Sequence, residues 1–378
     1  MRVIVAGGGS GGHAMPALAA ITRLRAEPGV EIQYVGSKTG IEREAAIGAG
    51  VPYHAVSTGR MRRARRWYGL LTRRNAADVP EVVRGTVESF ALLGRLRPSV
   101  VLATGGFVTV PVVWAARLRR IPVVIHEQTL QLGLANRLCA PAATRIALST
   151  PQSYDVLRPL WRRKATVTGN PVRGGVLNGE RSRAVERFAL ARDLPTILIT
   201  GGSLGAEKLN RAVLDVLPEL LDLANVIHQC GAAPGLTTTF RKLASAADPD
   251  APGTYALSEF LDASAMGDAY AIASLVVSRS GAGTTNELAA TGRPALLVPL
   301  VPTAGDEQRR NARTFASAGA AVVIDNEDFN GPRLASETRQ LLAAPDRLAA
   351  METAAASLAP GEAASALADL VLQTAGWT

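Results

Sequence analysis

The chain has few of the residues that several protein classes require. Only two cysteines, Cys139 and Cys230, occur among its 378 residues, and their spacing fits neither a metal site nor a redox motif. We therefore expect both to be reduced thiols in the hydrophobic core. Aromatic residues make up 4% of the chain, so side chains on which nucleic-acid bases could stack are scarce. This composition predicts no nucleic-acid partner.

Long apolar runs and targeting signals are also lacking. A membrane-spanning helix needs about 18 apolar residues, whereas the apolar stretch PALLVPLV covers only residues 294–301. The N-terminus runs directly into the strand-like RVIVA and a glycine loop, without the pattern of a signal peptide. These absences predict a cytoplasmic protein.

Positive charge is present in excess. Arginine and lysine total 41 against 32 acidic residues, and only four of the 41 are lysines. The net charge of +9 favours anionic partners such as phosphates or an acidic membrane surface. The segment 59–74, GRMRRARRWYGLLTRR, combines seven arginines with apolar side chains. It predicts peripheral attachment to an anionic membrane, although an ordinary amphipathic helix in solvent is the alternative.

Buried strands alternate with helices in two similar halves. The first half opens with RVIVA, a glycine loop and a helix from near Pro16, and residues 195–221 repeat this order. The alternation predicts an α/β protein with two Rossmann-like domains, each a doubly wound parallel sheet, facing a deep cleft. We place the domains at 1–168 and 169–359, with a C-terminal helix at about 360–378 that packs back on the first.

Three glycine-rich turns precede predicted helices, at residues 7–12, 201–205 and 281–283. The first matches the dinucleotide fingerprint G-x-G-x-x-G. No acidic residue follows the strand at 31–37 to bind a ribose, which argues against NAD. Backbone amides at such turns bind anions with help from the helix dipole. Phosphate-binding turns in both domains favour a nucleotide-sugar glycosyltransferase over a dehydrogenase.

Eight motifs, in order across nearly the whole chain, resemble the MurG family of glycosyltransferases. They are GGGSGGHAMPALA, TGGFVTVPVVWAARLRRIPVVIHEQ, GLANRL, GNPVR, GGSLGAEKLN, EFLD, SRSGAGTTNELAATGRPALLVP and GDEQRRNA. The resemblance implies a GT-B fold and inverting transfer of GlcNAc from UDP-GlcNAc to a polyprenyl-diphosphate acceptor. In the family this reaction converts lipid I to lipid II in peptidoglycan synthesis, at the inner face of the cell membrane.

The resemblance also implies which residues bind the donor. The second domain would bind the diphosphate through Ser203, the ribose through Glu287, the uracil through the backbone of Leu261, and GlcNAc through Gln308. Arg173 would contact UDP. The remaining donor-binding candidates are Gly202, Ala282, Gly283, Thr284, Thr285 and Asn286, with Ser10, Gly11, Gly12 and Thr129 from the first domain.

For the acceptor, the resemblance points to the glycine turns of the first domain. The candidates are Gly9, Ser10, Gly11, Gly12, His13, Gly106, Phe107, Glu127, Gln128 and Thr129. His13 is the first choice for the catalytic base, because histidine side chains exchange a proton near neutral pH. A structural histidine or a phosphate ligand is the alternative role, and His126 and Glu127 are second choices as base. No Asp-x-Asp pair is placed at a strand end, so we predict no metal site and no obligatory cofactor, with a divalent ion at most stimulating.

Four positions depart from the family pattern. Thr129 replaces an asparagine, Leu132 a proline, Leu204 a glutamine and Phe107 a tyrosine. Most of these changes lie in the acceptor-binding half, whereas the donor-binding residues Arg173, Ser203, Glu287 and Gln308 are intact. A MurG-like paralogue with a different acceptor is therefore the first alternative function, and a UDP-GlcNAc 2-epimerase is the second.

Overall fold

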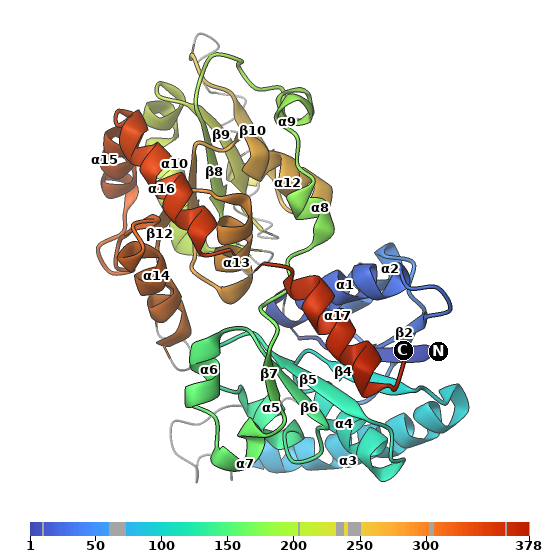
Figure 1. Cartoon of the computed structure of the whole chain (residues 1–378). Coiled ribbons are helices and arrows are strands. Elements are labelled where there is room, and N and C mark those ends of the chain that lie inside the picture. Colours follow the sequence, from blue (N-terminus) through green and yellow to red (C-terminus); the bar gives the residue numbers. More distant parts are fainter. Residues whose placement is uncertain are drawn as a thin grey trace. The chain divides into compact units, whose positions relative to one another are not determined.

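The structure, a computed structural model, describes residues 1–9, 11–59, 73–202, 205–231, 238–240, 251–301, 306–359 and 361–377. The chain divides into two compact units (Figure 1). Unit 1 comprises residues 1–172 and 361–378, and unit 2 comprises residues 173–360. The boundary thus follows Val172, four residues beyond the one expected after residue 168.

Unit 1 is built on a seven-stranded parallel sheet with the strand order β3-β2-β1-β4-β5-β6-β7. Its strands are β1 (Arg2–Ala6), β2 (Glu31–Gly36), β3 (Tyr53–Ala55), β4 (Val100–Ala103), β5 (Val123–Glu127), β6 (Arg145–Leu148) and β7 (Ala165–Val167). Its helices are α1 (Gly11–Arg25), α2 (Ile41–Gly48), α3 (Arg73–Leu96), α4 (Thr109–Leu118), α5 (Leu134–Cys139), α6 (Pro151–Asp155), α7 (Pro159–Arg162) and α17 (Ala363–Thr374).

Helices cover both faces of this sheet, which explains why its central strands are apolar throughout. Helices α1, α2 and α17 contribute to the core on one face, and α3, α4 and α5 contribute to the core on the other. The C-terminal helix α17 packs against α1 and strands β4, β5 and β6 (Figure 1). Unit 1 is therefore completed by the last residues of the chain.

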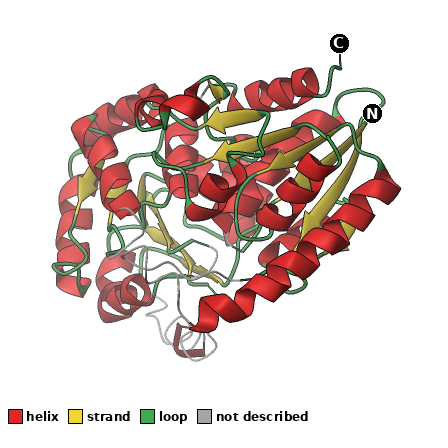
Figure 2. Ribbon diagram, turned by 90° about the horizontal axis from the view of Figure 1, so that it is seen from below, coloured by secondary structure: helices red, strands yellow, loops and turns green. Residues whose placement is uncertain are grey.

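Unit 2 repeats the design with a six-stranded parallel sheet in the order β10-β9-β8-β11-β12-β13. Its strands are β8 (Thr196–Thr200), β9 (Asn225–Gln229), β10 (Tyr255–Ser258), β11 (Leu275–Ser278), β12 (Ala295–Leu297) and β13 (Ala321–Val323). Its helices are α8 (Gly174–Leu177), α9 (Arg181–Phe188), α10 (Glu207–Leu221), α12 (Ala263–Ile272), α13 (Ala282–Thr291), α14 (Glu307–Ser317), α15 (Gly331–Leu342) and α16 (Pro345–Ser357). Figure 2 shows the strands of both sheets enclosed by helices. The prediction of two doubly wound parallel sheets is confirmed.

Two local expectations have clear outcomes. Both cysteines are buried and neither forms a disulfide, as predicted. The expected helix start near Pro16 is wrong, because α1 begins at Gly11. The left-handed backbone of Gly9, with φ +82°, turns the chain so early that the helix follows almost directly. Pro16 lies inside the helix and cannot donate to the carbonyl of Gly12, so one helical hydrogen bond is missing there.

Each sheet has a point where the strand order reverses, between β1 and β4 in unit 1 and between β8 and β11 in unit 2. Chains leave neighbouring strands there in opposite directions, and ligands of doubly wound sheets bind beyond the carboxyl ends of those strands. The predicted glycine turns follow β1 and β8 directly, and the third follows β11 after Arg279 and Ser280. The fold thus places all three turns where such proteins bind ligands.

Candidate active site

In unit 1, the glycine turn after β1 packs directly on the turn after β4. The amide of Gly8 donates a hydrogen bond to the carbonyl oxygen of Gly105 at 3.2 Å. A Cβ atom on Gly106 would lie 2.1 Å from the Gly8 carbonyl oxygen, and Gly106 has a φ of +86°. Only glycine fits this close approach of two backbones. The contact brings two of the predicted acceptor-binding segments together.

A buried carboxylate that the sequence did not reveal fastens the first turn. Glu42, from α2, is 0% exposed. One of its oxygens accepts from the Gly9 amide at 3.1 Å, and the other accepts from the amide and hydroxyl of Ser37, at 3.0 and 2.6 Å. An acidic side chain therefore does lie near the end of β2, where a dinucleotide site would need one, but it binds the glycine turn after β1. The Gly9 amide already has a partner, which leaves phosphate binding at this turn to the amides that open α1.

His13 lies in the first turn of α1 and is half-buried. Its Nδ1 atom is 3.0 Å from Oε1 of Gln128 and 3.2 Å from the carbonyl oxygen of Thr104. Thr104 also donates through its hydroxyl to the His13 carbonyl oxygen at 2.8 Å. The imidazole is thus held from one side, by two segments that follow β4 and β5.

Neither second choice for the base has an accessible nitrogen or oxygen. Glu127 is 2% exposed. Its Oε1 accepts from the amide and hydroxyl of Thr129 at 3.1 and 2.7 Å, and its Oε2 accepts from the Gly133 amide at 2.7 Å and from Nδ2 of Asn136 at 2.9 Å. These four bonds favour a structural role for Glu127 in shaping the loop 129–133. His126 is fully buried, and burial lowers its pKa to about 4.

The other predicted residues of unit 1 differ in their exposure to solvent. Gly12 is exposed at the start of α1. Phe107 is partly buried and packs against the hydrophobic core, and Gln128 is 5% exposed. Ser10 lies outside the described residues, as does nearly all of the basic segment 59–74.

In unit 2, the turn after β8 has the backbone expected of a phosphate-binding loop. Gly202 has a φ of +81°, its amide donates to the Thr200 hydroxyl at 3.1 Å, and its carbonyl accepts from Nε2 of Gln229 at 3.0 Å. Ser203 and Leu204 lie outside the described residues, so the role of Ser203 stays a prediction.

Two predicted donor-binding residues form a buried ion pair. Oε1 of Glu287 accepts from Arg173, with distances of 2.9 Å to Nη2 and 3.3 Å to Nε. Only 14% of the Arg173 side chain and 13% of the Glu287 side chain are exposed. The hydroxyl of Tyr270 donates to the other oxygen, Oε2, at 3.2 Å. Burial and the neighbouring carboxylate raise the pKa of Tyr270 far above its ordinary value, so the tyrosine remains a hydrogen-bond donor.

At the start of helix α13, the groups free to bind a ligand are mainly backbone amides and not side chains. Gly281 is the residue before the helix, and the first amides of a helix have no partner within it. The side chains of Thr285 and Asn286 bond to carbonyls of their own helix, at 3.1 and 2.6 Å. Ala282, Gly283 and Thr284 complete this first turn. The arrangement favours ligand binding by amides here, which suits an anion.

Gln308 opens α14 with one end of its amide held. Its Oε1 accepts from the Leu300 amide at 2.9 Å, which turns its NH2 group away from that contact. The Ser280 hydroxyl donates to the Gln308 carbonyl at 2.8 Å. The Leu261 side chain is 4% exposed, so only its backbone could meet a ligand, in line with the role expected from the resemblance.

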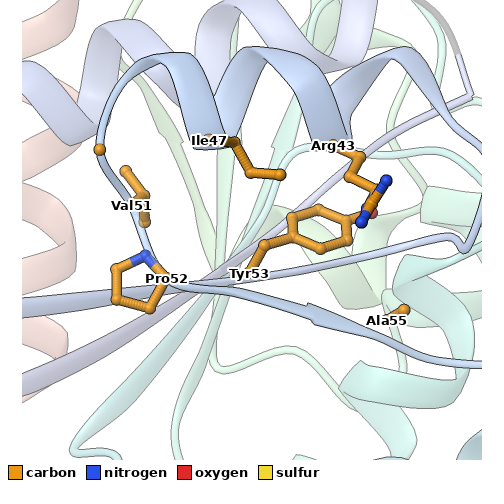
Figure 3. A pocket seen from close by; sticks show the side chains of 7 residues that line it. Arg43, Ile47, Val51, Pro52, Tyr53 and Ala55 are labelled. Atoms are coloured by element: carbon orange, nitrogen blue, oxygen red, sulfur yellow. The ribbon is translucent and has the colours of Figure 1, made fainter.

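A surface hollow in unit 1 involves other residues. It lies between α2 and β3, where Arg43 and Ile47 stand above Tyr53 (Figure 3). The Tyr53 hydroxyl donates to the Ser37 carbonyl at 2.5 Å. None of the residues lining the hollow is a predicted site residue. No group of three or more metal-binding side chains was found in the described part of the chain.

Family models match both units. Residues 3–148 match the "Glycosyltransferase family 28 N-terminal domain", and residues 196–370 match the "Glycosyltransferase family 28 C-terminal domain". Together with two Rossmann-like units and turns suited to phosphate, these matches define a family 28 glycosyltransferase with the GT-B fold.

Individual relatives narrow the assignment. The UDP-N-acetylglucosamine–N-acetylmuramyl-(pentapeptide) pyrophosphoryl-undecaprenol N-acetylglucosamine transferase of Lachnoclostridium phytofermentans is 38% identical over 88% of both chains. That of Lachnospira eligens is 37% identical over 90% of this chain and 91% of its own. The crystal structure of Acinetobacter baumannii MurG matches with a TM-score of 0.68 and 26% identity, over 98% of this chain and 99% of that one. The chain belongs to this family of transferases, the MurG family.

Epimerases share the fold alone. A UDP-GlcNAc 2-epimerase from Neisseria meningitidis superposes with a TM-score of 0.66 at 16% identity, covering 99% of each chain. The sequence relationship therefore favours the transferase over the epimerase.

Two residues of these networks were missed by sequence reasoning. Glu42 lies 33 positions from the Gly9 amide that it binds, and Tyr270 lies 17 positions from Glu287. Neither belongs to a quoted motif, and no local pattern distinguishes them from ordinary helix residues.

Proposed function

We propose that this chain transfers GlcNAc from UDP-GlcNAc to lipid I and so forms lipid II. The observation that carries the proposal is the 38% identity, over 88% of both chains, to a transferase named for this reaction. The intact ion pair of Arg173 and Glu287 and the held amide of Gln308 supply, in unit 2, the polar groups expected for a UDP-sugar.

The chemistry assigns His13 the role of base. The acceptor hydroxyl oxygen attacks C1 of GlcNAc as its proton passes to Nε2 of His13. The bond between C1 and the β-phosphate oxygen breaks, and UDP leaves with the electron pair, so the configuration at C1 inverts. The amides at the start of α13 and the Arg173 guanidinium would stabilise the charge of the leaving diphosphate. This scheme requires no obligatory metal, and a divalent ion would at most stimulate it.

A transfer assay with labelled UDP-GlcNAc and lipid I tests the proposal. We expect labelled lipid II and free UDP from the wild type. His13→Ala should lower turnover by about 10²–10⁴-fold, the usual contribution of a general base, with UDP affinity unchanged because UDP binds unit 2. His54→Ala is the matched control, since His54 lies on the edge strand β3 and bonds to Gln33.

Each other outcome contradicts a defined part of the proposal. UDP binding without transfer to lipid I would point to a different acceptor, and interconversion of UDP-GlcNAc with its 2-epimer would point to an epimerase. Normal turnover of His13→Ala would remove the base role alone.

We also infer that the enzyme works at the cytoplasmic face of an anionic membrane, as a peripheral protein. No described helix has the length and apolarity needed to cross a bilayer. Helix α3 instead presents an apolar stripe on its outer side, formed by Val79, Val83, Val87 and Phe90, which are 52%, 58%, 65% and 39% exposed. These positions follow one another at spacings of four and three residues, so they share one side of the helix.

The apolar stripe of α3 follows a segment that also combines apolar side chains with arginines. The segment 59–74 leads into α3, and its last two arginines, Arg73 and Arg74, are the first residues of that helix. Helix α3 packs on α4 (Figure 1), where Leu118 is 65% exposed. Apolar side chains beside cations suit the boundary between lipid head groups and acyl chains.

Sedimentation with vesicles tests this attachment. We expect Val83→Asp/Val87→Asp to bind vesicles of phosphatidylglycerol more weakly than the wild type, at an unchanged melting temperature, since both side chains face solvent. Ile47→Asp is the control, at an exposed apolar position on α2. Equal binding of the double variant and the wild type would refute the role of α3.

A further inference from the structure

A chain of buried hydrogen bonds determines which ring nitrogen of His13 carries its proton. Nδ1 of His13 faces two oxygens, Oε1 of Gln128 at 3.0 Å and the Thr104 carbonyl at 3.2 Å. A carbonyl oxygen can only accept a hydrogen bond, and a neutral imidazole has a single N–H. The proton therefore sits on Nδ1, and the lone pair sits on Nε2. No described residue forms a hydrogen bond with Nε2 of His13.

The amide of Gln128 is held in the orientation that this tautomer needs. Its Nε2 donates to the Thr104 carbonyl at 2.6 Å and to Nδ1 of His126 at 3.0 Å. Both amide hydrogens are used in this way, and Oε1 is left to face His13. A reversed amide would set Oε1 against the Thr104 carbonyl and would turn N–H groups toward the Nδ1–H of His13.

His126 lies at the far end of this series of hydrogen bonds and sets its direction. Its Nε2 is 3.0 Å from the Gly169 carbonyl oxygen, so Nε2 carries the proton and Nδ1 accepts from Gln128. The side chain is 0% exposed, and desolvation lowers its pKa to about 4. His126 therefore stays neutral near pH 7, and its Nδ1 remains an acceptor.

We propose that Gln128 is a positioning residue that holds His13 as the Nδ1–H tautomer, with the lone pair of Nε2 directed to the acceptor hydroxyl. The contribution of Gln128 to turnover rests on the proposed base role of His13. The wrong tautomer would offer an N–H where the reaction needs a proton acceptor. In serine proteases, loss of the correct histidine tautomer lowers kcat by about 10⁴-fold.

Nitrogen NMR of the ring atoms tests the tautomer directly. The chain has only four histidines, so protein labelled with ¹⁵N-histidine gives few signals, and His13→Ala identifies those of His13. We expect Nδ1–H in the wild type and a shift toward Nε2–H in Gln128→Met, because Nδ1 then keeps only the longer contact with the Thr104 carbonyl at 3.2 Å. Gln131→Met is the matched control, because Gln131 is exposed in the same loop. Unchanged signals of His54, which lies on β3 of unit 1 and contacts Gln33, would show that unit 1 keeps its fold.

Turnover tests whether Gln128 acts through His13. Gln128→Met should lower kcat by about 10- to 100-fold, no more than the loss of a base, and should lower it no further in the His13→Ala background. An Nδ1–H tautomer in Gln128→Met would overturn the proposal, as would an equal loss of turnover with and without His13. The base role fails separately, if His13→Ala retains turnover while Gln128→Met still shifts the tautomer.

Discussion

Replacement of Glu287 tests whether one carboxylate serves both the stability of unit 2 and the binding of UDP. Glu287 is held by Arg173 through Oε1 and by Tyr270 through Oε2. In Glu287→Ala, the Arg173 guanidinium would remain in a place where only 14% of its side chain meets solvent, with no counter-charge from Glu287.

The expected loss of stability follows from this burial. Removing one partner of a buried ion pair costs about 3–5 kcal/mol, and the Tyr270 hydroxyl also loses its bond to Oε2, worth about 1 kcal/mol. For a domain the size of unit 2, residues 173–360, a loss of about 4 kcal/mol lowers the melting temperature by roughly 8–16 °C.

A double variant separates the two roles of Glu287. Arg173→Met/Glu287→Leu removes both charges and keeps similar volume, so most of the lost stability should return. UDP affinity should not return, because the double variant lacks both the carboxylate that would accept the ribose hydroxyls and the Arg173 guanidinium that would contact UDP. Hydrogen bonds to charged groups are worth about 1.5–3 kcal/mol, which corresponds to a roughly 10- to 100-fold weaker Kd.

Calorimetry provides both measurements, scanning for the unfolding of unit 2 and titration for UDP binding. Glu352→Ala is the matched control, since Glu352 is 45% exposed and its distance to Arg293 is 3.9 Å. That variant should lose less than about 1 kcal/mol. The smallest shift expected from a loss of about 1 kcal/mol is roughly 2 °C. If Glu287→Ala melts within about 2 °C of the wild type, the reasoning on burial is refuted. Normal UDP affinity of the double variant would refute the ribose contact.

Two further predictions concern unit 1. Gly106→Ala should destabilise it by more than about 2 kcal/mol, because its Cβ would lie 2.1 Å from the Gly8 carbonyl at a φ of +86°. Gly9→Ala should cost less in a thermal melt, since nothing lies within 4 Å of its Cβ, and equal losses would contradict the steric argument. His126 has a pKa lowered to about 4, so the unfolded chain gains protons first as the pH falls. The contribution of neutral His126 to the free energy of unfolding is complete above pH 6.5, the ordinary pKa of histidine. This contribution decreases as the pH falls from 6.5 to about 4. Urea unfolding of wild type and His126→Gln should show a steeper loss for the wild type across that range, and parallel curves would disprove it.

Much of the fold could be predicted from the sequence because its signals are local. Runs such as RVIVA and TILIT are apolar at every position, which is typical of parallel strands covered on both faces. Each is followed by glycines and a helix, and that order was enough to predict two doubly wound sheets. The residues of the eight motifs were likewise sufficient to identify the family.

The partners of the site residues could not be read in the same way. Glu42 binds Gly9 across 33 positions and Tyr270 binds Glu287 across 17, and neither stands in a recognisable pattern. Likewise, nothing in the sequence indicated that Glu127, an acceptor-binding candidate, holds its own loop through Thr129, Gly133 and Asn136.

The sequence by itself therefore determined the order of strands and helices, the places of the glycine turns and the family. Hydrophobic periodicity and the glycine requirement at positive φ act over a few residues, so they are visible in the chain. Only the tertiary structure decided which polar groups are buried together, and hence that His13 is held through Nδ1 by Gln128 and Thr104. Those contacts join helix α1 to the segments that follow β4 and β5, and burial gives them their strength and direction because water cannot replace a missing partner there.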